Sequence, residues 1–338
     1  MMQRILEITT RIGCSNICEY CPQAKLIKNY TENRHGHRIE KRFTENGDIK
    51  VLQKMLVHDY LNKDKNRETE MTLDTFKKCL STVPSSVDIH FTGYTEPFEN
   101  ESCIDMISHV LEKGHRISIN TTIVGMTKDT VDKLEALYIE YPAKQNKELN
   151  FHLPSDVFYE KIGRTRIKEK RETGNEISEE YMEMLDYILK SKLPIHKNTY
   201  HFHAHGGIHR EILERFKDRL RVKNRGINSR AGNLGKLTGE ALWENNWCGR
   251  IFHNVLLPDG GVQLCCQDYG LDEPLGNLKD MEYEEIHNTN KFYKISQGGA
   301  KLCQACDDGV AVPKDGKVKL TSMQNYQEEW RDERRVKK

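Results

Sequence analysis

Strand-like and helix-like segments alternate along the first two-thirds of the chain. Six short apolar segments with interleaved polar positions predict strands, and amphipathic segments between them, such as residues 101–113 and 179–190, predict helices. Regular alternation of the two kinds is typical of a parallel α/β fold. The predicted strands are residues 5–9, 87–92, 117–121, 149–153, 200–205 and 220–223.

One face of each predicted strand is apolar and the other is polar. Side chains two residues apart share a face of a strand, whereas parallel strands buried on both faces read as continuous apolar runs. The polar face therefore predicts a barrel interior that holds ligands rather than a packed core. Its predicted members are Glu7, Thr9, Asp88, His90, Ser118, Asn120, Asn150, His152, His201, His203, His205, Arg221 and Lys223.

Changes in composition divide the chain. Residues 30–67 are highly charged and poor in apolar side chains, which predicts an insertion after the first strand. We expect residues 1–228 to form a partial, six-stranded β/α barrel, residues 229–312 a small cysteine-rich domain, and residues 313–338 a charged tail. The SRAGN run at residues 229–233 is either a functional linker or a turn.

The net charge gives no argument for a polyanionic partner. Lys and Arg total 52 against 51 acidic residues, a formal net charge of +1, so we expect no nucleic-acid or membrane binding. No run of about eighteen apolar residues predicts a membrane-spanning helix, and the first residues lack a secretory signal. These features predict a cytoplasmic protein.

Seven of the ten cysteines fall into two groups, which indicates metal or redox chemistry because reducing compartments disfavour disulfides. Three thiolates in a short loop after the first strand can hold three irons of a 4Fe-4S cluster and leave the fourth iron open. Zinc is the alternative, although a structural zinc site needs four ligands. The first group is Cys14, Cys18 and Cys21, and the second is Cys248, Cys265, Cys303 and Cys306.

The first group resembles the signature of the radical S-adenosylmethionine (SAM) superfamily, CxxxCxΦC with an aromatic residue at Φ, here Tyr20. The GYTEP run at residues 93–97 follows the second strand, where the family carries a Gly-Gly-Glu-Pro-like loop that binds the SAM amino group; Tyr94 and Thr95 depart from that pattern. For Asn120, a hydrogen bond inside the barrel is as good an explanation as a contact with SAM. The resemblance implies SAM contacts from Tyr20, Gly93, Glu96, Asn120 and Thr121.

This resemblance implies a reaction and an electron source. SAM would bind the open iron, and one electron from a flavodoxin or ferredoxin-type donor would break its carbon–sulfur bond. The resulting 5'-deoxyadenosyl radical would abstract a hydrogen atom from a substrate. A barrel interior suits that chemistry because it shields the radical and holds the reactants in near-attack geometry.

The second cysteine group resembles a twitch domain, the shortened form of the SPASM module, which holds an auxiliary 4Fe-4S cluster. Gly260 and Cys265 match the spacing of that module, so Cys265 rather than Cys266 is the expected ligand. Four cysteines would equally satisfy zinc, and the preceding barrel favours iron. The cofactors implied are two 4Fe-4S clusters and SAM, with auxiliary ligands Cys248, Cys265, Cys303 and Cys306.

The last predicted strands indicate the kind of small-molecule substrate. The His, Arg and Lys side chains of these strands are hydrogen-bond donors that suit hydroxyl and phosphate groups better than a metal. They favour an anionic sugar or nucleotide sugar as the substrate. Such a substrate would undergo either dehydrogenation of an alcohol or epimerisation of a carbon. Twitch-bearing relatives include a dehydrogenase of an aminocyclitol, in which the auxiliary cluster would receive the second electron. Epimerisation would instead need a hydrogen donor, for which Cys266 is the candidate, although a buried inert cysteine is the commoner explanation. The expected substrate-binding residues are His152, His201, His203, His205, Arg221 and Lys223.

Two other functions stay open. Many SPASM relatives modify peptides, but the first strand begins at Ile5, which leaves no leader-binding domain before it, and the full set of SPASM cysteines is absent. A non-catalytic iron–sulfur or zinc protein would explain the cysteines. It would explain neither the GYTEP run nor the polar interior.

Overall fold

The computed structural model describes most of the barrel region and most of residues 246–311. The predicted insertion (apart from Tyr30), the predicted tail and Tyr20 lie outside the described residues. Within the described part, no helix is both long enough and apolar enough to cross a membrane. The described residues are 3–16, 18, 21–30, 68–141, 147–155, 157–159, 170–172, 177–195, 201–205, 207–225, 230, 231, 233, 246–298, 300–304, 306, 310 and 311.

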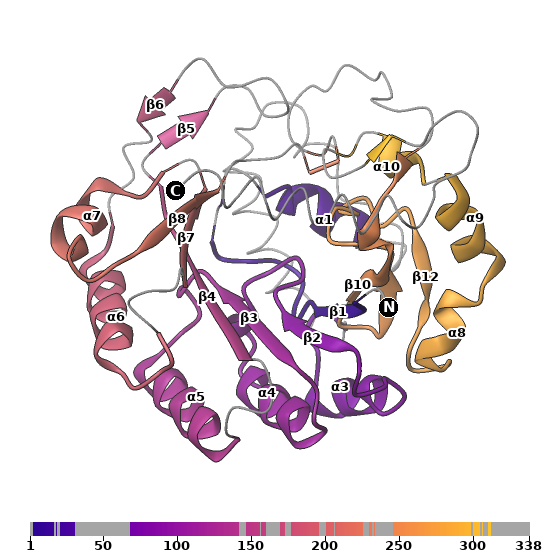
Figure 1. Cartoon of the computed structure of the whole chain (residues 1–338), viewed down its shortest axis with the longest axis horizontal. Coiled ribbons are helices and arrows are strands. Elements are labelled where there is room, and N and C mark those ends of the chain that lie inside the picture. Colours follow the sequence, from indigo (N-terminus) through magenta and orange to yellow (C-terminus); the bar gives the residue numbers. More distant parts are fainter. Residues whose placement is uncertain are drawn as a thin grey trace.

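One nine-stranded sheet runs through the described residues, in the order β12-β11-β10-β1-β2-β3-β4-β7-β8. The six strands from β1 to β8 in that order pair in parallel and form the predicted partial barrel, which is thereby confirmed (Figure 1). The last of them lies two residues later than predicted, which keeps the same residues on the same face. These strands are β1 (Ile5–Ile8), β2 (Asp88–Phe91), β3 (Ile117–Thr121), β4 (Lys147–Leu153), β7 (Phe202–His205) and β8 (Val222–Arg225).

Helices cover the outer side of the curved sheet, and α1 (Gln23–Asn29) lies on its inner side (Figure 1). Apolar side chains from the strands, among them Leu6, Ile89 and Phe151, are fully buried against the outer helices. Ser178 caps α6 by accepting from the Tyr181 backbone N–H at 3.2 Å, as the sequence predicts. The outer helices are α3 (Leu73–Leu80), α4 (Cys103–Glu112), α5 (Lys128–Glu140), α6 (Glu179–Lys190) and α7 (Arg210–Phe216).

Three strands of the cysteine-rich region extend the sheet beyond β1, which the sequence did not predict. β10 (His253–Leu256) pairs in parallel with β1, and β11 (Gly261–Gln263) and β12 (Pro274–Asn277) continue antiparallel. Gly260 in the turn between β10 and β11 has a φ of 83°, which favours glycine. The Pro-Asp-Gly-Gly run is therefore a hairpin turn.

Short elements complete the described chain. After β12 the chain forms two helices beside the sheet edge and a third near the cysteines of the C-terminal region (Figure 1). Two small two-stranded sheets pair β5 with β6 and β9 with β13. These elements are α8 (Tyr283–His287), α9 (Asn290–Gly298), α10 (Lys301–Gln304), η3 (Pro97–Glu99), η4 (Gly249–Phe252), β5 (Val157–Tyr159), β6 (Lys170–Glu172), β9 (Asn246–Trp247) and β13 (Val310–Ala311).

A second apolar cluster joins the N-terminal and C-terminal parts of the chain. Side chains from the first cysteine loop, α1 and the GYTEP run pack against side chains of β10 and of the segments that follow β10 and β11. Burial of this apolar surface stabilises the contact between segments more than 200 residues apart in sequence. The buried members of this cluster are Ile12, Leu26, Ile27, Tyr30, Tyr94, Val255, Leu257, Tyr269 and Leu271.

Candidate active site

The first cysteine loop, with Cys14, Cys18 and Cys21, connects β1 to α1 at the carboxyl end of the parallel strands. The Cys14 thiol lies against the backbone N–H groups of Asn16 and Glu96 and close enough to Cys18 to interact with its charge. A turn brings the Cys21 N–H to the Cys18 carbonyl oxygen at 3.0 Å. Burial is the main cause that raises the pKa of the Cys14 thiol, so iron binding there must displace a proton.

The GYTEP loop packs directly on the end of β1. Gly93 has a φ of 33°, and an added Cβ would collide with Thr9 Oγ1 and the Ile8 carbonyl oxygen, so only glycine fits. Thr9 Oγ1 also accepts from the Tyr94 N–H at 3.1 Å, and Thr95 Oγ1 donates to the Arg11 carbonyl oxygen at 3.0 Å. The loops that follow β1 and β2 therefore form one hydrogen-bonded unit.

Glu96 connects the end of β2 to the end of β3. Its Oε1 accepts from Thr121 Oγ1 at 2.7 Å, and its Oε2 accepts from the backbone N–H and the hydroxyl of Thr122 at 2.6 and 2.7 Å. Burial raises the pKa of this carboxyl, and the hydrogen bonds oppose that shift. The described contacts of Glu96 and Thr121 are with protein groups, and their SAM contacts stay a prediction.

Glu99 and Asn100, which the sequence reasoning did not single out, position the first cysteine loop. Glu99 Oε1 accepts from the Ser15 backbone N–H at 2.8 Å and from the Ser15 hydroxyl. Asn100 Nδ2 donates to the carbonyl oxygens of Thr10 at 2.8 Å and Met71 at 2.9 Å. The signal available in the sequence was a carboxylate and an amide, Glu99 and Asn100, close behind the GYTEP run.

A layer of imidazoles and amides spans β3, β4 and β7. The His152 ring lies parallel to the His205 ring, with centroids 5.4 Å apart, and its Nε2 lies 3.4 Å from Asn120 Oδ1. His203 Nε2 lies 3.2 Å from Asn150 Oδ1. The interior hydrogen bond left open for Asn120 is thus present, and these predicted interior residues lie together.

Burial keeps the imidazoles of His152 and His203 neutral. It is the main cause that lowers the pKa of His152 to about 3 and that of His203 to about 4, with smaller contributions from neighbouring His and Arg charges. Arg225 Nε donates to His203 Nδ1 at 3.0 Å, which leaves the ring proton on Nε2. Arg225 lies beyond the last predicted strand, which ends at Lys223, although the alternation of side chains continues through it.

His201, Arg221 and Lys223 belong to the same predicted face, and His201 and Arg221 lie just before the starts of their strands. His201 Nδ1 lies 2.9 Å from the Leu149 carbonyl oxygen of the neighbouring strand. Lys223 pairs in register with His203, and the exposed Arg221 precedes β8. Because His152 and Lys223 both pair in register with His203, these three residues lie at one level of the sheet. Of the six expected substrate-binding residues, His205 lies nearest the loops at the carboxyl end.

Glu7 lies in the interior next to Cys266. Burial raises the pKa of Glu7 to about 7, and the charges of Arg250 and Arg230 and a hydrogen bond with Cys266 oppose the shift. Arg230 belongs to the SRAGN run and has a left-handed φ of 51°, and its charge also acts on His152. Strained backbone at a non-glycine residue often marks a functional site.

Asp88, the other acidic residue of the predicted interior face, forms its ion pair with Arg116 and not with the basic residues of β8. Arg116 Nε donates to Asp88 Oδ1 at 2.6 Å, and Gln3 also donates to this carboxylate. Asp88 is buried at the start of β2, at the end of the sheet opposite the first cysteine loop. It therefore does not neutralise the basic residues on β8.

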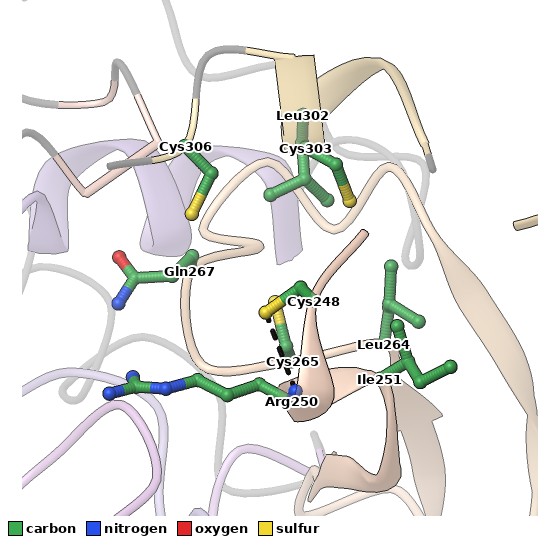
Figure 2. A pocket seen from close by; sticks show the side chains of 9 residues that line it. All are labelled: Cys248, Arg250, Ile251, Leu264, Cys265, Gln267, Leu302, Cys303 and Cys306. Carbon is green, nitrogen blue, oxygen red and sulfur yellow. Dashed lines mark hydrogen bonds between the residues drawn. The ribbon is translucent and has the colours of Figure 1, made fainter. Parts of the chain in front are cut away.

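All four cysteines of the second group line one pocket (Figure 2). Cys303 and Cys306 reach into it from α10 and the residues just after it, and Cys248 and Cys265 lie together on the opposite side. The remaining lining is largely apolar, from Ile251, Leu264 and Leu302. Figure 2 also shows the Arg250 side chain pointing away from the sulfurs.

Backbone donors in this four-cysteine pocket point at sulfur. The Arg250 N–H donates to Cys248 Sγ at 3.4 Å, and the Gln267 N–H donates to Cys265. Burial raises the pKa of the Cys265 thiol and that of Cys303, the latter to about 11. Four thiols with N–H donors and an apolar wall fit an iron–sulfur cluster, whose sulfurs such donors stabilise.

Comparison with known proteins identifies the C-terminal region and the fold. Residues 248–307 match the SPASM family, an iron-sulfur cluster-binding domain. A crystal structure of BtrN in complex with AdoMet and 2-DOIA has a TM-score of 0.50 at 15% identity, over 91% of this chain and 94% of that chain. Polyhistidine-tagged anSMEcpe with bound AdoMet has a TM-score of 0.48 at 13% identity, over 91% and 85%.

No curated protein sequence matches the chain. The family match begins at Cys248 and includes Cys265, Cys303 and Cys306, so the expected iron–sulfur domain is confirmed. The resemblance to enzymes with a SPASM-type domain behind a partial barrel is confirmed at the level of domain and fold.

Proposed function

We propose that this chain, a partial barrel of BtrN-like fold with a SPASM iron–sulfur domain, is a radical SAM enzyme acting on a small polar substrate. The observation that supports this most is the contact between the Cys14 thiol and the Glu96 backbone N–H. That contact brings the three-cysteine motif and the GYTEP run together at the carboxyl ends of β1 and β2. In a parallel α/β sheet this is the edge where ligands bind.

The described residues fit the cofactors that this function needs. Cys14, Cys18 and Cys21 would hold a 4Fe-4S cluster, and the four-cysteine pocket would hold a second. When bound, the clusters and SAM supply one-electron chemistry and a 5'-deoxyadenosyl radical. The chain itself contributes the GYTEP loop, anchored on Thr9 and Thr122, as the surface on which SAM would be oriented.

The chemistry of the interior supports one class of substrate. His152, His203 and Asn150 present neutral donors and acceptors, which suit hydroxyl groups, and the cationic Arg225 suits an anion. The BtrN structure of similar fold is a complex with AdoMet and 2-DOIA. We propose an anionic sugar or nucleotide sugar as the substrate, with SAM contacts from Gly93, Glu96, Asn120 and Thr121.

Two outcomes of hydrogen abstraction are open to such a substrate. Dehydrogenation would pass a further electron from the substrate radical to the cluster proposed for the four-cysteine pocket and release a proton, which gives a carbonyl. Epimerisation would return a hydrogen atom to the opposite face of the same carbon. Cys266, which lies in the interior beside Glu7, is the proposed donor for that return.

The test is the release of 5'-deoxyadenosine by reduced, reconstituted protein with SAM and a panel of deuterated sugars, nucleotide sugars and peptides. We expect anionic sugars to accelerate release and to transfer deuterium into 5'-deoxyadenosine. A carbonyl product would identify dehydrogenation, and solvent deuterium at the same carbon that Cys266→Ala abolishes would identify epimerisation. Stimulation by peptides alone would contradict the proposed substrate class.

A further inference from the structure

Two buried tyrosines connect the first cysteine loop to the four-cysteine pocket. The Tyr269 hydroxyl, from the segment after β11, lies 3.6 Å from Cys21 Sγ. The Tyr269 ring packs against the Tyr94 ring of the GYTEP loop, with centroids 4.8 Å apart. The Tyr94 hydroxyl donates in turn to the carbonyl oxygen of Cys265 at 2.8 Å.

The direction of the hydrogen bond at Cys21 follows from its chemistry. A cysteine that ligates iron is a thiolate and has no proton to donate. A phenol has an ordinary pKa of about 10 and carries its proton at neutral pH. Tyr269 is therefore the donor whenever Cys21 binds a cluster.

We propose that Tyr269 is a positioning residue that donates a hydrogen bond to the Cys21 sulfur and so raises the reduction potential of the N-terminal cluster. The inference rests on the proposed function, since it requires a cluster on Cys21. Adding an electron to a cluster increases the negative charge on its sulfurs, and a donor stabilises that charge. The SPASM domain would then influence the N-terminal cluster through direct contact.

Contacts around Tyr269 hold its hydroxyl in place. The Tyr94 hydroxyl bonds to the carbonyl oxygens of Cys265 and, at 3.1 Å, Asp268, so the segment that carries Tyr269 is fixed to the GYTEP loop. Asn29 Nδ2 donates to the Tyr269 carbonyl oxygen at 3.5 Å. Tyr94 and Tyr269 are 2% and 4% exposed, so water competes little with the bond to sulfur.

Gln23 is a second donor to the same sulfur. Its Nε2 lies 3.5 Å from Cys21 Sγ and also donates to the Tyr94 carbonyl oxygen. Gln23 belongs to α1, whereas Tyr269 belongs to the SPASM domain. Of these two donors, Tyr269 is therefore the one that connects the first cysteine loop to the second domain.

The experiment is a redox titration of the full, anaerobically reconstituted chain, followed by electron paramagnetic resonance of the N-terminal cluster, which SAM addition identifies. Tyr269→Phe removes the hydroxyl and keeps the ring against Tyr94. We expect the equilibrium constant for one-electron reduction of the N-terminal cluster to fall by up to about tenfold. A tenfold fall lowers the reduction potential by about 59 mV. Tyr283→Phe is the matched control because this buried tyrosine packs against Arg4 and His287 instead, and it should leave the potential unchanged.

A second variant keeps the inference testable if Tyr269→Phe does not retain iron. Tyr94→Phe removes the two bonds that fix the segment from Cys265 to Tyr269, and we expect a smaller shift in the same direction. An assembled N-terminal cluster with unchanged potential in the variant that retains iron would overturn the inference and leave the proposed function intact. Failure of the wild-type chain to assemble that cluster would instead contradict the proposed function.

Discussion

Burial determines the charge of individual residues in the interior. Two of the histidines predicted to bind substrate are neutral, because burial lowers the pKa of His152 to about 3 and that of His203 to about 4. Positive charge there comes from arginine, including Arg225, which bonds directly to His203. An anionic substrate would therefore meet its cation on β8, and His152 and His203 would act as neutral hydrogen-bonding groups.

Glu7 makes stability depend on pH. Burial raises its pKa from 4.5 to about 7, so its contribution to stability is fully present below pH 4.5 and is lost as pH rises through about 7. The loss amounts to about 3 kcal/mol by the linkage relation. We expect Glu7→Gln, which does not titrate, to lose less stability between pH 5 and 8 in urea unfolding. An identical pH dependence in both proteins would contradict this assignment.

Glu96 is predicted to hold SAM at the GYTEP loop. Glu96→Ala removes a carboxylate that four protein donors orient, and we expect SAM affinity to fall roughly tenfold or more, as for a lost charged hydrogen bond. Equilibrium dialysis with labelled SAM measures the change. Iron content should stay intact, and the exposed neighbour Glu101→Ala should bind SAM normally. Unchanged affinity in Glu96→Ala would show that GYTEP is only a turn.

The loops that follow β1 and β2 act as one structural element because side chains cross between them. Asn100, 3% exposed, is the main link, since it donates to Thr10 and Met71 and accepts from the Ser102 N–H at 2.8 Å. Asn100 therefore positions the segment that begins the first cysteine loop. Burial shields its amide from water that could otherwise replace these partners.

Asn100→Ala should destabilise this element by about 1 to 3 kcal/mol, because buried carbonyl oxygens lose their donor. Chemical unfolding measures the loss, and we expect iron to leave the N-terminal cluster at lower denaturant than in the wild type. The exposed Asn224→Ala provides the control. Equal stability of the Asn100 variant and the wild type would contradict this role.

The local elements could be predicted from the sequence far better than their long-range pairing. Alternation of apolar and polar residues located the six barrel strands, and the residue type at the start of a helical segment located the Ser178 cap. Both signals are local properties of the sequence. The β1–β10 pairing joins residues about 250 positions apart, and no local pattern encodes it. The spacing of the cysteines predicted both cysteine sites. No spacing pattern predicts a role for Tyr269, which was identified only from its contact with Cys21 in the structure.

At the scale of the whole molecule, the barrel and the SPASM domain share one sheet. β10 pairs with β1 along four residues, directly before the first cysteine loop. Tyr94 and Tyr269 join the same two parts near Cys21, at the end of that loop. The two proposed clusters are therefore attached to one continuous framework, and the interior between them is the proposed reaction chamber.

Reductive cleavage of SAM by the reconstituted chain tests the central claim most directly. The account predicts that wild-type protein binds about eight irons, as two cubanes require, and releases 5'-deoxyadenosine when reduced with SAM. Replacing Cys14, Cys18 and Cys21 by Ala should halve the iron and abolish 5'-deoxyadenosine, whereas Cys79→Ala, a buried thiol outside both cysteine groups, should do neither. Wild-type protein that binds about eight irons and SAM yet releases no 5'-deoxyadenosine would contradict the account.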